Sequence, residues 1–312
     1  MNSVGTLVIS ACYAEGGLSD LGVILERPRV TKLFIGQLPE AVVKTVPYIY
    51  TLCAQAQRAA AQAALAAAGD EVPRPADHAA LWAEMLHEHL WRLLLDWPQA
   101  LGLPQARDAL VTWRNARVGD SLAAATDRLL RDTLLGVAPG EWQGDPAPAS
   151  LAARCLVLLG GEKEGGFDLP PLTPEAWLAY WQGRHPCPPL TPRPPSVAVA
   201  YRRRLHEAVQ AARALQAGTD YPVVAVGGGG WGVGQTLTAR GVLTHATRLE
   251  DGRVADYRIW APTDRHFADS QDLQALLGGG EWPDAGRARR ALERAVLALD
   301  PCLPYELKVN HA

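Results

Sequence analysis

The stretch LTARGVLTHATRLEDGRVADYRIWA, residues 237–261, decides the fold of the C-terminal third of the chain. Apolar, β-branched and aromatic residues are dense in residues 237–248 and again in 254–261, which predicts two strands. The LEDGR segment between them, residues 249–253, contains the Asp-Gly dipeptide that favours tight turns. The two strands are therefore expected to form a β-hairpin, and residues 221–226 to form a further strand before it.

Two polar side chains are expected at the same end of this hairpin. Arg240 and Gly241 lie on its first strand, and Pro262 and Thr263 come directly after its second strand. A guanidinium and a neutral hydroxyl placed side by side can hydrogen-bond a small anionic ligand. The alternative is an ordinary surface hairpin that holds no ligand.

The middle of the chain is predicted to be mainly helical. Residues 50–68 are rich in strong helix formers, and their many alanines indicate a helix that packs closely against its neighbours. Apolar residues recur at helical spacing in residues 76–96, and Trp97-Pro98 is expected to end that helix. Further helices are predicted at residues 105–116, 121–135, 150–159, 174–181, 196–217 and 284–299.

Short strands are predicted upstream of the helices, at residues 7–9, 23–25 and 33–35. The chain is therefore expected to have an α+β fold, with a mainly helical core, small N-terminal β elements and a C-terminal β-hairpin. We expect a single domain over residues 1–312. Its parts are an N-terminal β region (1–40), a helical core (41–218), a hairpin region (219–266), and a C-terminal helix with its tail (267–312).

The composition argues against two classes of partner. The formal net charge is −3, whereas a non-specific nucleic-acid binder needs clustered positive charge. No apolar run reaches the roughly 18 residues that a membrane helix needs, and residues 1–10 lack the basic residues of a signal peptide. We expect a cytoplasmic protein without nucleic-acid or membrane partners. The basic run 202–204 is interpreted as a solvated helix face.

Three other patterns were weighed for chemistry. The glycine run 227–234 contains G-x-G-x-x-G, but a strand follows it where a dinucleotide site needs a helix. His87 and His89 would face different directions on one helix, so a shared metal ion is not expected. The five cysteines are scattered and contain no Cys-x-x-Cys, which argues against disulfides or zinc. Cys302 differs, because a proline turn at a helix end can present its thiolate.

Taken in order, these motifs resemble the large subunits of [NiFe]-hydrogenases. Residues 238–245, 250–257 and 261–263 match that family's A-P-R-G-x-L-x-H segment, hairpin turn and V-P-T/S segment. Residues 300–303, Asp-Pro-Cys-Leu, match the start of its D-P-C-x-x-C-x-x-H signature. Residues 39–53 have the family's spacing from a proline to the second cysteine of R-x-C-G-x-C. In the helical middle of the chain, the resemblance extends only to the mainly helical character and not to specific motifs.

The chain departs from the family's metal-ligand pattern. The family residues missing here are two cysteines, an arginine and two histidines; they are replaced by Tyr50, Tyr305, Tyr48, Gln57 and Lys308 respectively. Of the four expected cysteines, Cys53 and Cys302 remain. A nickel site of this kind needs four soft thiolates, so the resemblance implies no nickel and no enzyme activity.

The retained residues resemble the HupK/HoxV group of hydrogenase accessory proteins, which are scaffolds for an iron carrying two cyanides and one carbonyl, Fe(CN)2CO. The resemblance implies that Cys53 and Cys302 hold this iron. It also implies a pocket for the diatomic ligands, formed by Arg240, Thr263, Pro262, Leu243 and Ala239, the last in place of the usual proline. Expected partners are a hydrogenase large-subunit precursor and the HypC/HypD-type complex that builds the iron unit. The alternative is a metal-free chaperone that mimics the large subunit and binds maturation partners.

Overall fold

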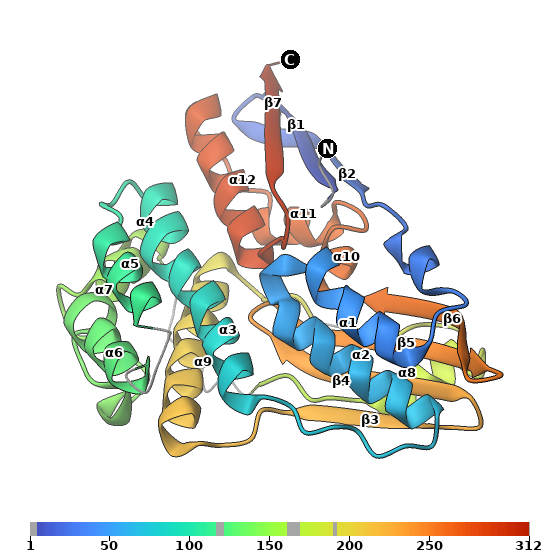
Figure 1. The fold of residues 1–312 in the computed structure, drawn as a ribbon. Coiled ribbons are helices and arrows are strands. Elements are labelled where there is room, and N and C mark those ends of the chain that lie inside the picture. The colour runs from blue at the N-terminus through green and yellow to red at the C-terminus, as the bar shows by residue number, and fades with distance from the viewer. Residues whose placement is uncertain (1–4, 117–121, 161–168, 190–191, 312) are drawn as a thin grey trace.

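The structure, a computed structural model, describes residues 5–116, 122–160, 169–189 and 192–311. Helices gather on one side of the molecule, a four-stranded sheet on the other, and a three-stranded sheet above them (Figure 1). The α+β class and the mainly helical middle are confirmed. None of the helices in the described ranges is both long enough and apolar enough to cross a bilayer.

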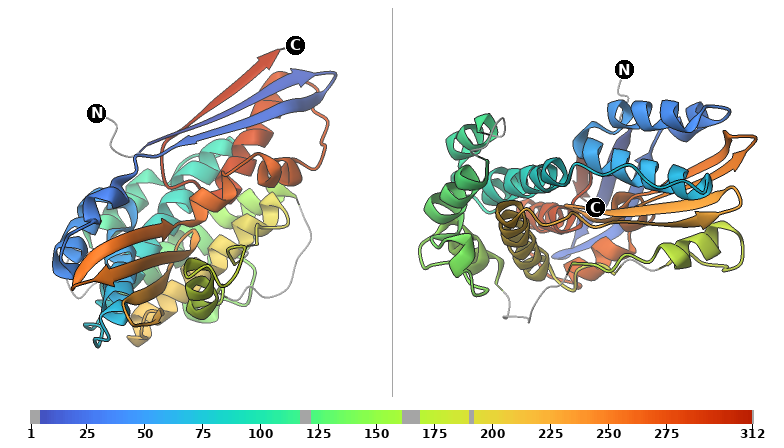
Figure 2. Two further views of the ribbon diagram at one scale, coloured as in Figure 1. Left: turned by 90° about the vertical axis from the view of Figure 1, so that its right-hand side faces the viewer. Right: turned by 60° about the horizontal axis from the view of Figure 1, so that its bottom comes forward.

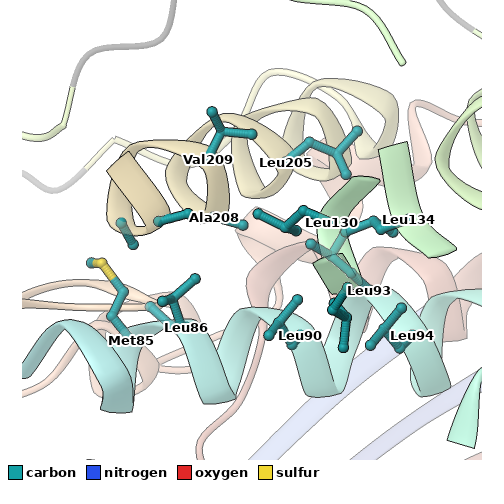
Figure 3. Close-up of a cluster of buried hydrophobic side chains, with 14 of the residues drawn as sticks. Met85, Leu86, Leu90, Leu93, Leu94, Leu130, Leu134, Leu205, Ala208 and Val209 are labelled. Atoms are coloured by element: carbon teal, nitrogen blue, oxygen red, sulfur yellow. The ribbon is translucent and has the colours of Figure 1, made fainter. Parts of the chain in front are cut away.

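The helical side is organised around two long helices, α3 (His78–Trp91) and α9 (Val197–Ala217). Leucines spaced at helical intervals along α3 and its extension face α9 and residues 130–134, forming one apolar core (Figure 3). The surrounding elements are α5 (Arg107–Asn115), α6 (Leu122–Leu129), a π-helical turn (Leu130–Leu135), a 3-10 turn (Pro139–Glu141) and α7 (Leu151–Leu159). Residue 121, where one helix was predicted to begin, lies outside the described residues.

Trp97-Pro98 does not end the α3 segment, contrary to the prediction. The chain passes from α3 through a π-helical turn (Arg92–Asp96) into α4 (Trp97–Ala100). Pro98 lies in the first turn of α4, where its missing N–H removes no bond that the short helix needs. The helical path therefore continues to Ala100.

The second layer is an antiparallel sheet of β3 (Val223–Gly228), β4 (Trp231–Thr238), β5 (Gly241–Glu250) and β6 (Arg253–Trp260), in chain order. The predicted hairpin is confirmed as β5 and β6, with Glu250 opposite Arg253. The single strand predicted over 237–248 is wrong. The chain turns there and continues as β5, beginning at Gly241, whose φ of +123° only glycine adopts readily. The turn carries Arg240.

The glycine run belongs to this sheet and not to a phosphate loop. A Cβ on Gly232 would lie 2.1 Å from the Ala64 oxygen, and one on Gly234 would lie 2.3 Å from the Ala60 oxygen. Alanines of α2 (Ala54–Ala68) therefore rest directly on the backbone of β4. The predicted close packing of this alanine-rich helix is confirmed. Figure 2 shows α2 on one face of the sheet and α8 (Pro174–Trp181) on the other.

The helix predicted over residues 50–68 starts later than expected. A separate helix, α1 (Pro39–Ile49), ends just before residue 50. A 3-10 turn (Thr51–Cys53) follows, and α2 begins only at Ala54. This break places Cys53 at the N-terminal end of α2. Its side chain is thereby directed toward the sheet side of the molecule, where it joins the wall of a cavity.

The third layer joins the two ends of the chain. Strand β1 (Thr6–Ala14) pairs antiparallel with β2 (Gly17–Glu26) and parallel with β7 (Tyr305–His311) (Figure 1). Helices α11 (Gln271–Leu277) and α12 (Ala285–Leu299) pack against this sheet. The third N-terminal strand, predicted at residues 33–35, is wrong. Residues Val30–Phe34 form a 3-10 helix, because Phe34 buries its ring edge-on against Tyr257.

Candidate functional site

A cavity of about 70 Å³ lies where segments from both ends of the chain meet. The sequence predicts seven site residues, all in one pocket. Six of them line this cavity, namely Cys53, Cys302, Arg240, Leu243, Pro262 and Thr263. Ala239 is buried beside Arg240 but does not line it. Tyr50 and Gln57 also line it. The cavity is therefore walled by two sulfurs, two guanidiniums (Arg27 and Arg240), and a mixture of polar and apolar side chains.

Cys53 is half-buried in the cavity wall. Its Sγ accepts a hydrogen bond from Gln57 Nε2 at 3.6 Å. Burial, with a smaller contribution from the nearby Cys302, raises the pKa of the Cys53 thiol to about 12. The protein alone therefore holds Cys53 as a neutral thiol at neutral pH, and a soft metal ion would have to displace its proton.

A chain of hydrogen bonds fixes the side chain that faces Cys53. The Tyr257 hydroxyl lies 2.8 Å from His245 Nδ1, and His245 Nε2 lies 2.8 Å from Gln57 Oε1. Since the amide oxygen can only accept, His245 carries its proton on Nε2 and Tyr257 donates to Nδ1. The amide nitrogen of Gln57 is thereby turned toward the sulfur.

Cys302 follows the turn that ends α12. Asp300 closes the helix in the left-handed region, with φ of 49°. The Cys302 backbone N–H donates to Thr263 Oγ1 at 3.1 Å. Thr263 is fully buried in α10 (Pro262–His266), and its own hydroxyl hydrogen is left to donate to another group. Cys302 thus lies just after a turn at a helix end, where the sequence places it.

Arg27 is a site residue that the sequence reasoning missed. Its Nη2 donates to Cys302 Sγ at 2.9 Å, and its Nε lies 3.1 Å from Asp264 Oδ1. Arg27 was given no role by the motifs, which mark only Arg240 as a site arginine. Arg27 directly follows β2, and no motif in the sequence marks it as a site residue.

Arg240 enters the cavity from the β4–β5 turn. Its Nη2 donates to Glu88 Oε2 at 2.7 Å, and its Nε lies 3.5 Å from Asp300 Oδ2. Its Nη1 is buried and has no hydrogen-bond partner among the residues that the structure describes. A buried N–H donor without a partner is rare in proteins and costs free energy, so it marks a position where a ligand can accept.

The guanidinium of Arg240 belongs to a buried ion network around Asp300. Arg92 Nε lies 2.6 Å from Asp300 Oδ1, and Arg204 Nη2 lies 2.7 Å from Oδ2. Burial alone would raise the pKa of the Asp300 carboxyl, but the guanidiniums of Arg204, Arg240 and Arg92 outweigh it and hold the pKa well below its usual range. Asp300 therefore stays charged and orients Arg240.

The interpretation of Arg204 as part of a solvated face is wrong. Arg204 is buried because it reaches Asp300 from α9, while Arg202 and Arg203 are half-buried at the edge of the same helix. Arg204 also donates to His89 Nδ1 at 3.2 Å. Burial and the charge of Arg204 keep the pKa of His89 well below its ordinary value, so this histidine is a neutral member of the core.

No family model matches the chain. Curated relatives do. The chain is 29% identical to the hydrogenase expression/formation protein HupK of Azotobacter vinelandii, over 99% of both chains. It is 28% identical to HupK of Rhizobium leguminosarum bv. viciae, over 99% of this chain and 97% of that one. It is 27% identical to HoxV of Cupriavidus necator, over 92% of each. The chain is therefore similar to the HupK and HoxV proteins over nearly its whole length.

Solved structures agree with this relationship at the level of fold. A [NiFeSe] hydrogenase variant of Desulfovibrio vulgaris Hildenborough matches with a TM-score of 0.54 and 13% identity, over 96% of this chain and 98% of that one. The reduced, active Ni-Fe-Se hydrogenase of Desulfomicrobium baculatum matches with a TM-score of 0.54 and 13% identity, over 93% and 95%. The predicted fold, that of hydrogenase large subunits, is confirmed.

Proposed function

We propose that this HupK/HoxV relative is a scaffold for hydrogenase maturation, which holds the Fe(CN)2CO unit and passes it to a hydrogenase large-subunit precursor. One observation carries the proposal: Cys53 and Cys302, from opposite ends of the chain, line one cavity beside the unpaired Nη1 of Arg240. The names of the relatives, expression/formation proteins, support a role in maturation. The fold of a hydrogenase large subunit supports the proposal that this protein offers the iron unit a site similar to that of the large-subunit precursor.

The chemistry of the cavity fits this cargo. Two thiolates together with two cyanides and a carbonyl would give iron five strong ligands. Cyanide nitrogens accept hydrogen bonds, and Arg240 Nη1 and the Thr263 hydroxyl can donate to them. Leu243 and Pro262 offer apolar contact to a carbonyl. At about 10–15 Å³ for each enclosed water, the cavity has room for about five such molecules, comparable to three diatomic ligands.

The same residues argue against nickel and against hydrogenase chemistry. Tyr50 lines the cavity where the resemblance places the first N-terminal cysteine. Tyr305 lies in β7, in the apolar cluster of the three-stranded sheet, and not in the cavity wall. Two sulfurs cannot provide the four thiolates that such a nickel centre needs. The proposed role is therefore carriage and not catalysis.

The proposed partners follow from the proposed cargo. An iron unit that carries diatomic ligands must be built elsewhere, and the HypC/HypD-type accessory complex is the proposed donor. The proposed acceptor is the hydrogenase large-subunit precursor. Both exchanges need access to the cavity from solvent, and Leu52, one of its lining residues, is 44% exposed.

Infrared spectroscopy tests the proposal. Protein purified without oxygen from a hydrogenase-producing host should show stretching bands of cyanide and carbonyl. Cys53→Ser and Cys302→Ser should each abolish them, whereas Cys187→Ser, at an exposed position outside the cavity, should leave them unchanged. Absence of the bands from the wild-type protein, with partner binding insensitive to Cys53 and Cys302, would replace the scaffold with the metal-free chaperone.

A further inference from the structure

Two thiols that face one cavity create a problem of metal selectivity. Thiolates bind Zn²⁺, Ni²⁺ and Cu⁺ tightly, and in a cell these ions compete with any other occupant. This inference rests on the proposed function in one respect, that Cys53 and Cys302 are the ligands of the cargo metal. A carrier built on them needs a feature that keeps simple cations out.

Arg27 is positioned to provide that feature. Its guanidinium touches Cys302 Sγ at 2.9 Å and is held on its other side by Asp264 Oδ1 at 3.1 Å. Arg27 lines the same cavity as both cysteines, and less than a quarter of its side chain is exposed. The positive charge is thus fixed beside the sulfur by a second anchor and cannot swing freely into solvent.

The charge beside Cys302 acts differently on two kinds of metal. A bare divalent cation would meet a guanidinium already hydrogen-bonded to the sulfur that it needs, and like charges at such short range repel strongly in a partly buried site. An iron that brings two cyanide anions carries no net charge before it meets the thiolates. The guanidinium therefore repels a bare divalent cation much more strongly than an iron that carries two cyanides.

The small number of metal-binding side chains around the cavity also disfavours simple divalent cations. Across the described parts of the chain, no cluster of three or more His, Cys, Asp or Glu side chains is arranged to hold a metal ion. Zn²⁺ in proteins is almost always bound by at least three side chains, so the two sulfurs alone are a weak site for it. Asp264, which could add a charge, is engaged by Arg27.

We propose that Arg27 sets the metal specificity of the site: it excludes bare divalent cations from the Cys53–Cys302 pair and admits a metal whose charge is offset by its own anionic ligands. Removal of the guanidinium frees the Cys302 sulfur and the Asp264 carboxylate together. The cavity then becomes a site with two sulfurs and a released carboxylate, and Arg240 is the one guanidinium left among its described lining residues.

Titration with Co²⁺ tests this, because cobalt–thiolate bonds give strong charge-transfer absorption. The metal-free, reduced wild-type chain should bind Co²⁺ weakly. Arg27→Met and Arg27→Gln should each bind it at least about tenfold more tightly, and Arg27→Lys, which keeps the charge, should remain close to wild type. Arg287→Met, which removes an exposed arginine in α12, is the matched control and should change nothing.

The location of the ion is checked in the same assay. Adding Cys302→Ser to Arg27→Met should abolish the gain, and adding Asp264→Asn should reduce it. Equal affinities of the wild type, Arg27→Met and Arg27→Gln would overturn the proposal, as would a gain in Arg27→Lys as large as that in Arg27→Met. Circular dichroism confirms folding, and the two neutral variants differ enough in polarity that one failing to fold leaves the other to decide.

This outcome is separable from that of the proposed function. The Co²⁺ assay uses protein that has never met the iron unit. If infrared bands are absent from the wild type while Arg27→Met gains cobalt at Cys302, the iron scaffold fails and Arg27 still controls the metal access of the cysteine pair. Bands present with no gain in Arg27→Met would leave the scaffold standing and remove the role of Arg27.

Discussion

Arg204 donates to Asp300 across 2.7 Å and so joins α9 to the turn that carries Cys302. The contact is buried on both sides, since Asp300 is 2% exposed and Arg204 is 7% exposed. Two further arginines, Arg92 and Arg240, approach the same carboxylate. A single acidic side chain therefore contacts three guanidiniums that come from three separate segments, two of which also pair with Glu88 and Asp96.

Asp300→Asn should destabilise the fold strongly. It leaves three buried guanidiniums without their shared countercharge, and removal of one partner from a buried ion pair typically costs about 3–5 kcal/mol. Urea unfolding at neutral pH measures the loss. The exposed Glu306→Gln on β7 is the control, and its effect should stay within about 0.5 kcal/mol. A loss below about 1 kcal/mol for Asp300→Asn would mean that the network does not stabilise the fold.

Gly232→Ala and Gly234→Ala should each push α2 away from β4. The added carbon would lie 2.1 Å from the Ala64 oxygen in the first variant and 2.3 Å from the Ala60 oxygen in the second. Overpacking of this kind typically costs about 1–3 kcal/mol, and here the obstacle is backbone, which cannot rotate away. Gly140→Ala is the control, because nothing lies within 4 Å of its added carbon. Thermal unfolding should rank the control with the wild type and the other two far below it.

His245 should make the protein sensitive to mild acid. Burial lowers its pKa to about 3, so the folded protein keeps it neutral while the unfolded chain takes up a proton below about pH 6.5. The contribution of the neutral His245 to the free energy of unfolding is fully present above that pH. It falls by about 1.4 kcal/mol for each pH unit as the pH drops toward 3.

Urea unfolding at pH 7.5 and pH 5.5 measures this contribution. The decline between the two should be about 1.4 kcal/mol smaller in His245→Gln than in the wild type. His185→Gln, at an exposed position, serves as the control and should decline as the wild type does. Equal declines in His245→Gln and the wild type would show that the imidazole is protonated in the folded state.

Thr263→Val should weaken the turn that carries Cys302. Valine matches threonine in shape but removes the oxygen that accepts the Cys302 N–H at 3.1 Å. A buried N–H left without a partner costs about 1–3 kcal/mol. Thr263→Ser keeps the hydroxyl and should recover most of the loss in urea unfolding. If serine and valine are equally destabilised, the lost methyl packing is the cause and not the hydrogen bond.

Local pattern sufficed to predict most helices and the β5–β6 hairpin, because these elements depend on neighbours in sequence. The strand β7 was not predicted. Its residues, Tyr305–His311, form a strand because β1 offers a parallel edge from the opposite end of the chain. The 3-10 helix at Val30–Phe34 was likewise missed, because the burial of Phe34 against Tyr257 decides it.

The candidate site was predicted only where a motif marked it. The gathering of Cys53, Cys302 and Arg240 in one cavity follows the resemblance to hydrogenase large subunits. Arg27 carries no motif, and on sequence alone an arginine after a strand is an ordinary surface residue. The prediction for Arg204 was wrong for a similar reason. Helical periodicity indicates on which face of a helix a residue lies, but it does not show that the Asp300 carboxylate packs against that face.

The pairing of β1 with β7 also sets an order of events for the chain during its synthesis. A nascent chain on the ribosome presents Cys53 long before residue 302 emerges, and β1 has only β2 beside it until residue 311 has been added. Anything that needs both sulfurs can therefore be loaded only after translation has passed this point. A stop codon before residue 302 would leave the first strand with one open edge and the first cysteine without its counterpart.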